Sequence, residues 1–346
     1  MVNSKPIIIF CQAPADIPYL LTIYEKNKGN TEISIFVINV ENMFLFIKEL
    51  NMNVKQIIFI PYTPHCFKNI SRIVEERTRI KRLIKENFEP VSNSLVYFFS
   101  RFEDWLTSSF IAALAKDKSN SIVYADHYDL SAAVFKKSHF NLKALTLKVV
   151  LGYMTDIRFR TQILEKLPEF PIDRYKIRTI AAALNPSVFS RYSYQIPDEA
   201  KRPVVLLLVS PSMEVLYEEK DYDHMQYKII DFLKNAGWTI VVKGHPRLGV
   251  PENIKPLIDI LIPEHIPAEF IGGKNIDLCL GIVSNAAVNF LKNTGVPTFS
   301  LLHLFEFKKV EMYEQYMSYL SQSSDNQIGY FDDFQNFQQI IQEIKC

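Results

Sequence analysis

A short basic segment, "VVKGHPRLG", has the residue types needed to hold an anion. Its β-branched residues predict the end of a buried strand, and the polar corner that follows is formed by Lys243, Gly244, His245, Pro246 and Arg247. A strand end suits polar groups that face a ligand, and lysine, histidine and arginine together suit a negative charge. The alternative is a β-turn whose basic side chains are only solvated, and the motif alone favours neither interpretation.

A second candidate lies in "GIVSNAAVNFL", where a predicted strand passes into a predicted helix at Ser284 and Asn285. Serine and asparagine are favoured helix N-caps, so this pair can be read as a cap. The free N–H groups of a helix N-terminus and a hydroxyl also form a phosphate site, and a cap can leave neighbouring amides for a ligand. The chain has ten glycines and lacks both G-x-G-x-x-G and G-x-x-x-x-G-K, which disfavours dinucleotide and P-loop chemistry.

In the first half, "SIVYADHYDLSAA" places Asp126, His127 and Asp129 just past a predicted strand. A carboxylate there could take a proton from a hydroxyl or bind a metal. Asp129 precedes an apolar helical run, which favours a capping role, whereas Asp126 is closer to the strand end and is the better general base. A base on one domain that faces an imidazole on another is what a two-substrate reaction needs.

Further candidates are weaker. Ser210 and Ser212 follow a predicted strand in "LLLVSPSME" and could line a ligand site. Glu269 follows a proline that could begin a helix; it is either a helix N-terminal acid or a hydrogen-bond acceptor for a ribose hydroxyl. The acids at 221–223 resemble a metal-binding triplet but open a predicted helix, where acids suit the helix dipole, so we expect no metal site.

Composition narrows the function classes. A net charge of +1 over 346 residues, with no basic stripe interleaved with aromatics, gives no argument for nucleic-acid binding. Four scattered cysteines without C-x-x-C argue against a disulfide scaffold or a zinc site and fit a reducing cytoplasm. The apolar run near the N-terminus is too short for a secretory signal or a spanning helix, so we expect a cytoplasmic protein. Peripheral membrane attachment and a homodimer are left open.

Short apolar runs alternate with helical patterns, which predicts an α/β fold with parallel sheets. A stretch with Pro186, Pro197 and Pro203 interrupts this alternation and marks a linker. Two Rossmann-like domains with a central cleft follow, and ligands are expected at the carboxyl ends of the strands. The expected parts are a first domain over 1–190, a linker over 191–203, a second domain over 204–310, and a helical tail over 311–346 that packs back across the domains.

Four motifs occur in a fixed order: Tyr-x-Asp at Asp126, K-x-H-P-R around His245, "IPAE" at Glu269, and the strand-to-helix turn at Ser284. Together they resemble the bacterial sialyltransferases and polysialyltransferases of the GT-B fold, including the lipooligosaccharide sialyltransferases of glycosyltransferase family 52. The resemblance covers the order of elements over most of the chain, but its specific motifs cover only short stretches. The His-Pro element is the most telling of them.

The resemblance implies residue roles. The family's general base is an acid of an [Asp/Glu]-[Asp/Glu]-Gly motif, and Asp126 takes the second acidic place, while Ala125 and His127 replace the first acid and the glycine. His245 is expected at the phosphate of the leaving CMP. Ser284 matches the first residue of the family's phosphate-binding turn, where asparagine replaces the second hydroxyl.

The implied reaction is an inverting, metal-independent transfer of sialic acid, or a related nonulosonic acid, from its CMP-sugar to a hydroxyl of a bacterial cell-surface glycan such as capsule or lipooligosaccharide. One phosphate needs an imidazolium and helix amides rather than a divalent metal, so no cofactor is expected. The first domain would bind the acceptor, near His127 and Asp129, and the second would bind CMP. The alternatives are a UDP-sugar epimerase-like enzyme and a non-catalytic nucleotide- or glycan-binding protein on the same fold.

Overall fold

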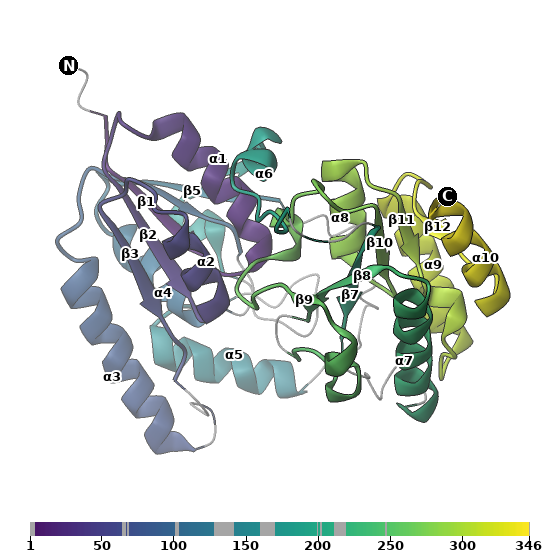
Figure 1. Cartoon of the computed structure of the whole chain (residues 1–346). Helices are drawn as coiled ribbons and strands as arrows, with labels where there is room; N and C mark the ends of the chain where they lie inside the picture. Colours follow the sequence, from purple (N-terminus) through teal and green to yellow (C-terminus); the bar gives the residue numbers. More distant parts are fainter. Residues whose placement is uncertain are drawn as a thin grey trace. The chain divides into compact units, whose positions relative to one another are not determined.

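The protein is described from a computed structural model, and its chain divides into two compact units, Met1–Asn185 and Pro186–Cys346. The described residues are 4–63, 67, 69–100, 104–127, 142–159, 170–198, 200, 203–210, 219–245 and 248–345. Each unit is built on a six-stranded sheet with helices on its faces (Figure 1).

The first unit contains a fully parallel sheet in the order β3-β2-β1-β4-β5-β6. Its central strands are short and apolar, as expected for strands covered on both faces. The strands are β1 (Ile7–Cys11), β2 (Ile33–Ile38), β3 (Gln56–Ile60), β4 (Leu95–Phe98), β5 (Ser121–Asp126) and β6 (Arg178–Ala181).

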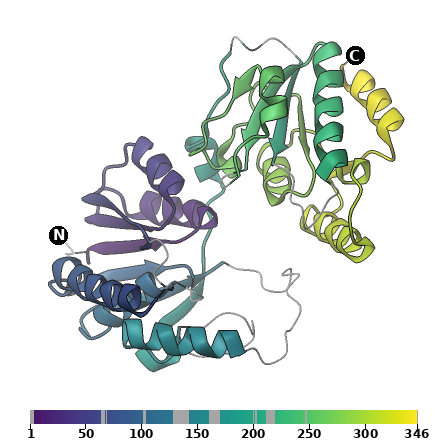
Figure 2. The same ribbon diagram turned by 90° about the horizontal axis from the view of Figure 1, so that it is seen from below.

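Helices cover both faces of this sheet, with α1 and α2 on one face and α3 and α5 on the other (Figure 2). Asn69 and Asp104 cap the N-termini of α3 and α4, where each side chain accepts a backbone N–H bond. The helices are η1 (Pro14–Asp16), α1 (Ile17–Asn27), α2 (Glu41–Glu49), α3 (Ile70–Asn87), α4 (Trp105–Leu114), α5 (Leu142–Thr155) and η2 (Ile172–Tyr175).

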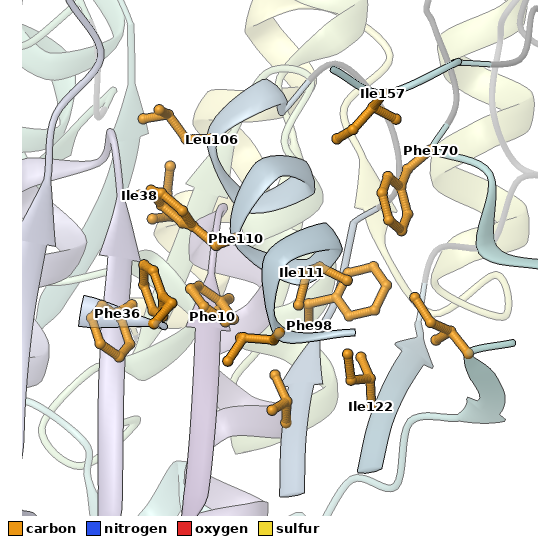
Figure 3. Close-up of a cluster of buried hydrophobic side chains, with 14 of the residues drawn as sticks. Phe10, Phe36, Ile38, Phe98, Leu106, Phe110, Ile111, Ile122, Ile157 and Phe170 are labelled. Carbon is orange, nitrogen blue, oxygen red and sulfur yellow. The ribbon is translucent and has the colours of Figure 1, made fainter. Parts of the chain in front are cut away.

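An aromatic core joins the sheet to α4 in the first unit (Figure 3). The rings of Phe10 and Phe36 stack at 5.3 Å, and Phe110 of α4 lies 6.1 Å from Phe10. Phe88, just after α3, fills the space between them, 4.6 Å from Phe110. Buried aromatic pairs contribute about 0.5–1.5 kcal/mol beyond their area burial, so this cluster fixes the helices on the sheet.

The second unit repeats the same topology. Its parallel sheet has the order β12-β11-β10-β7-β8-β9. When its strands are counted from β7 and the sheet is read from the opposite edge, this is the order of the first sheet. In both sheets the strand order reverses beside the first strand, between β1 and β4 and between β7 and β10. The strands are β7 (Val204–Val209), β8 (Thr239–Gly244), β9 (Ile260–Leu261), β10 (Leu278–Gly281), β11 (Thr298–Ser300) and β12 (Gly329–Tyr330).

The helices of the second unit pack in two clusters. One contains α7 and α10, and the other contains α8 and α9. The helices are α6 (Ser187–Arg191), α7 (Glu219–Asn235), η3 (Glu252–Leu257), η4 (Ala268–Phe270), α8 (Asn285–Thr294), η5 (Leu302–Leu304), α9 (Val310–Ser323) and α10 (Phe334–Lys345). Within the described ranges, no helix has both the length and the apolar character needed to cross a membrane.

The structure adds detail at the expected domain limits. The compact units meet at Asn185 and Pro186, and the stretch expected as a linker over 191–203 follows α6 inside the second unit. There Tyr194 donates its N–H to the carbonyl of Phe270 at 2.7 Å. Residues 311–346, expected as a helical tail, contribute most of α9 and the whole of β12 and α10 to the second unit.

Truncating Phe337 tests whether α10 is part of this second core. Its ring is fully buried, 5.6 Å from Phe232 of α7 and 5.0 Å from Phe331. We expect Phe337→Ala to lower the free energy of unfolding by about 3–5 kcal/mol, because it leaves a cavity in the core. Gln335→Ala, an exposed position on the same helix, should change it by less than about 0.5 kcal/mol. If urea denaturation gave the same loss of free energy of unfolding for Phe337→Ala as for Gln335→Ala, α10 would not be a core element.

Candidate functional site

Three neighbouring strands of the second unit end at one level. Val209 pairs with Gly244, and Leu208 pairs with both Lys243 and Gly281. Ser210, His245 and the turn that leads to Ser284 therefore leave the sheet along the same carboxyl edge. Adjacent strands are about 4.8 Å apart, so the ends of β8 and β10 are separated by roughly 10 Å, a span that a phosphate and a ribose can fill.

His245 is held by a tight turn directly after β8. Its N–H donates to the carbonyl of Gly249 at 3.0 Å, and the N–H of Gly249 donates back to the His245 carbonyl at 2.8 Å. Gly249 has a φ of 72°, in the left-handed region that favours glycine. Pro246 and Arg247, the next two residues of the sequence, lie outside the described residues, as do Asp129 and Ser212.

Lys243 is the last residue but one of β8, and its side chain lies inside the protein. It is only 4% exposed, and its Nζ donates to the carbonyls of Glu264 at 3.0 Å and Pro263 at 3.4 Å. Burial lowers the pKa of Lys243, while Glu264 and Glu269 raise it. Burial raises the pKa of Glu269, while its own backbone N–H and Lys243 lower it. Lys243 thus fastens the segment after β9 and lies within electrostatic range of Glu269.

Ser284 is the N-cap of α8, which confirms the capping interpretation. Its Oγ accepts a hydrogen bond from the N–H of Ala287 at 3.3 Å, and Asn285 is the first, exposed residue of the helix. The hydroxyl of Ser300 donates to the carbonyl of Ile282 at 2.6 Å and fixes the turn before the helix. The positive end of the α8 dipole is therefore held at the carboxyl edge of the sheet, where it favours an anion.

Ser210 is fixed from its backbone at the end of β7. Its carbonyl accepts hydrogen bonds from the hydroxyl of Tyr222 at 2.9 Å and from Nε2 of Gln226 at 3.2 Å. Burial raises the pKa of Tyr222 to about 12, so the hydroxyl remains a donor at neutral pH. Tyr222 and Gln226 belong to α7, which also carries Asp223, so the acids at 221–223 lie within this helix.

In the first unit, Gln12 ties β1 to β4 where the strand order reverses. Its Oε1 accepts the N–H of Ser100 at 2.9 Å, and its Nε2 donates to the Ser100 carbonyl at 3.2 Å and to Asp104 at 2.8 Å. Burial raises the pKa of Asp104, while hydrogen bonds, including those from Thr107 and Gln12, lower it. The edge between β1 and β4 is thus closed by a hydrogen-bonded polar network.

Asp126 and His127 follow one another at the end of β5. Asp126 is the last residue of the strand, and its Oδ1 accepts the hydroxyl of Tyr124 at 3.1 Å. The Nε2 of His127 lies 2.8 Å from Oδ1 of Asp16, and the ring of Tyr19 stacks on the imidazole at 4.4 Å. The structure therefore joins His127 to a partner that the sequence had not indicated, Asp16, while Asp126 pairs with Tyr124 of its own strand.

That partner, Asp16, is completely buried at the end of η1. Its Oδ2 accepts the N–H groups of Gln12 at 2.7 Å and Ala13 at 2.9 Å, and its Oδ1 faces His127. Burial raises the pKa of Cys11 well above its ordinary value, and the charge of Asp16 raises it further. The only sequence signal for Asp16 is its place soon after the first apolar strand, on the edge where Asp126 also lies.

The two edges differ in chemistry. The first unit offers carboxylates and an imidazole, a set that can accept a proton. The second unit offers an imidazole and a helix N-terminus, a set that can receive an anion. Within the described part of the chain, no three His, Cys, Asp or Glu side chains form a group that could hold a metal ion.

Comparisons with known proteins establish the fold. No protein-family model matches the sequence, and no curated protein matches it significantly. Arabidopsis thaliana UGT89C1, solved with UDP-L-rhamnose, is 10% identical with a TM-score of 0.50, and the match covers 100% of this chain and 91% of that one. A putative UDP-N-acetylglucosamine 2-epimerase from Listeria monocytogenes is 13% identical with a TM-score of 0.47, over 98% and 91% of the chains. With its two parallel six-stranded sheets, the chain has the GT-B fold.

Gly244 tests how tightly the His245 turn is packed. A Cβ added at Gly244 would lie 2.6 Å from Cγ2 of Val250 and 2.9 Å from the carbonyl oxygen of Gly249. We expect Gly244→Ala to lower the free energy of unfolding by about 1–3 kcal/mol, because the turn must shift to make room. At Gly281 the nearest atoms would be 3.4 Å away, so Gly281→Ala is the milder control. Equal losses in urea denaturation would contradict the packing described here.

Proposed function

We propose that the protein is an inverting, metal-independent glycosyltransferase that moves sialic acid, or a related nonulosonic acid, from its CMP-sugar to a hydroxyl of a glycan acceptor. The observation that carries the proposal is the common level of β7, β8 and β10, which brings His245 and the N-terminus of α8 to one edge. The GT-B fold, and the resemblance of the motifs to sialyltransferases, support a nucleotide-sugar substrate.

The charge at this edge fits one phosphate. A CMP-sugar carries a single phosphodiester, which one imidazolium and the amides of one helix can balance. In the proposal, His245 and the turn at Ser284 receive this phosphate, and Glu269 accepts a hydrogen bond from a ribose hydroxyl. Lys243 acts mainly by holding the segment that leads to Glu269, since its ammonium group already donates to two carbonyls. No metal takes part.

The proposed step is a direct displacement. The acceptor hydroxyl attacks the anomeric carbon, the new C–O bond forms, and the bond to the phosphate oxygen breaks with inversion. CMP leaves with the bonding electrons, and His245 stabilises or protonates its phosphate. The proton of the acceptor passes to the end of β5 in the first unit, where Asp126 and His127 stand. In the proposal the acceptor is a cell-surface glycan and the enzyme works in the cytoplasm.

Nucleotide preference tests the donor. We expect CMP to raise the melting temperature in buffer that contains EDTA, because a ligand at a hundredfold excess over its dissociation constant stabilises the folded state by about 2.7 kcal/mol. UDP, UDP-sugars and NAD at the same concentrations should leave the melting temperature unchanged. Stabilisation by UDP but not by CMP would contradict the donor assignment and would favour a UDP-sugar enzyme instead. CMP binding without turnover of any CMP-sugar would favour a binding protein.

His245 can be tested by titration with CMP. His245→Ala removes a charge-assisted hydrogen bond to the phosphate, worth about 1.5–3 kcal/mol, so we expect the dissociation constant of CMP to rise roughly 10- to 150-fold. Turnover should fall as well. His224→Ala, which makes the same change at an exposed position of α7, is the matched control and should bind CMP normally. If calorimetry finds equal CMP affinity in both variants, His245 does not hold the phosphate.

A further inference from the structure

We infer that His127 is the catalytic base and that Asp16 is the residue that positions it, so that the acceptor's proton goes to the imidazole and not to Asp126. The inference rests on the proposed function for its reaction, but the pair itself is a feature of the first unit. Nε2 of His127 and Oδ1 of Asp16 are 2.8 Å apart, although 111 residues separate them in sequence.

The hydrogen bonds of Asp16 define which ring nitrogen is basic. Its Oδ2 accepts two backbone N–H groups, from Gln12 and Ala13, and its Oδ1 faces Nε2 of His127. Because a carboxylate oxygen accepts hydrogen bonds, Nε2 is the nitrogen that carries a proton. In the neutral imidazole the basic lone pair is then on Nδ1. The same carboxylate stabilises the imidazolium that forms when Nδ1 takes a second proton, as in other base–carboxylate pairs.

The ring is also fixed in place by its neighbours. Tyr19 of α1 stacks on it at 4.4 Å with 15° between the planes, and Phe99 lies 5.7 Å away at a tilted angle. The side chain of His127 is only 5% exposed and that of Asp16 is fully buried. A base that is held in a single orientation and largely shielded from water can meet a hydroxyl without reorganisation.

Asp126 is less suited to the same task. Its Oδ1 already accepts a hydrogen bond, from the hydroxyl of the buried Tyr124 at 3.1 Å. An imidazole is the side chain that most often acts as a general base, and His127 is the one held by a buried carboxylate at this edge. Among the described residues, the titratable side chains that contact His127 include Asp16 and Tyr19, and Cys11 lies within electrostatic range of Asp16.

The proton and electrons balance in this step. The acceptor O–H bond breaks as its oxygen bonds to the anomeric carbon, and the proton moves to Nδ1 of His127. The bond between the anomeric carbon and the phosphate oxygen breaks, and its electron pair leaves with CMP. The imidazolium afterwards returns its proton to solvent, so His127 starts the next turnover unchanged.

The test compares His127→Gln and Asp16→Asn with Asp126→Asn. In His127→Gln the new amide can still donate to Asp16, so the buried carboxylate keeps a partner while the base is lost. In Asp16→Asn the amide oxygen can still accept the two backbone N–H groups, but its NH₂ donates to Nε2 and forces the ring proton onto Nδ1. We expect both variants to lose about 10²–10⁴-fold in kcat with unchanged CMP affinity, and Asp126→Asn to lose at least tenfold less.

The ring tautomer of His127 separates a positioning role of Asp16 from a structural one. Nitrogen NMR of the wild-type protein should show His127, assigned by its loss in His127→Gln, protonated at Nε2 when neutral, and Asp16→Asn should reverse this tautomer. Asp104→Asn, which alters another buried carboxylate of the same edge, is the control and should leave the tautomer of His127 unchanged.

The outcomes distinguish this inference from the proposed function. If Asp126→Asn abolishes transfer and His127→Gln retains it, the base assignment is overturned while the glycosyltransferase proposal stands. A wild-type His127 protonated at Nδ1 when neutral also overturns the base assignment. If the wild-type protein transfers from no CMP-sugar and does not bind CMP, the proposed function fails and the assigned reaction fails with it.

Discussion

The reversal of strand order beside the first strand of each sheet is the constraint on which the rest of the structure depends. Parallel strands place all their carboxyl ends on one edge, and the connections diverge where the order reverses. Between β1 and β4 the gap is closed by Gln12, which bonds to the backbone of Ser100 and to Asp104. In the second unit β7 and β10 meet at the corresponding place, with Ser210 fixed by α7 and Ser284 capping α8. In each unit, therefore, the strand order alone brings these polar groups to one edge of the sheet, without any ligand.

Burial of charge at these edges is tolerated because each charged group has hydrogen-bond partners. Asp16 accepts from two backbone N–H groups and faces an imidazole, and Lys243 donates to two backbone carbonyls. An uncompensated buried charge would cost several kcal/mol, so these partners are required for stable folding. A side chain held in this way has little freedom to move, which makes it a better positioning group than a mobile ligand contact.

The sequence could predict the parts that depend on local patterns. Apolar runs indicated most of the strands, and Ser284 followed by a helical pattern indicated α8 and its cap. Strand β6 was missed because its residues are largely exposed and form no apolar run, and β12 is only two residues long. Asp16 was missed for another reason: its significance comes from His127, 111 residues later, and no local pattern carries that contact. Local sequence patterns cannot predict contacts of this kind, because the sheet brings together residues that are far apart in the sequence.

The same topology supports opposite chemistry in the two units because different residues follow equivalent strands. After β1 the chain provides a carboxylate, Asp16, whereas after β7 it provides the hydroxyl of Ser210. After β8 it provides His245 in a glycine-bounded turn, and after β10 a capped helix. An edge rich in carboxylates stabilises a positive charge that forms on an imidazole, and an edge with a helix N-terminus stabilises a departing phosphate. The proposed transfer from a nucleotide-sugar would use both kinds of chemistry, because one proton and one phosphate must leave the reacting atoms.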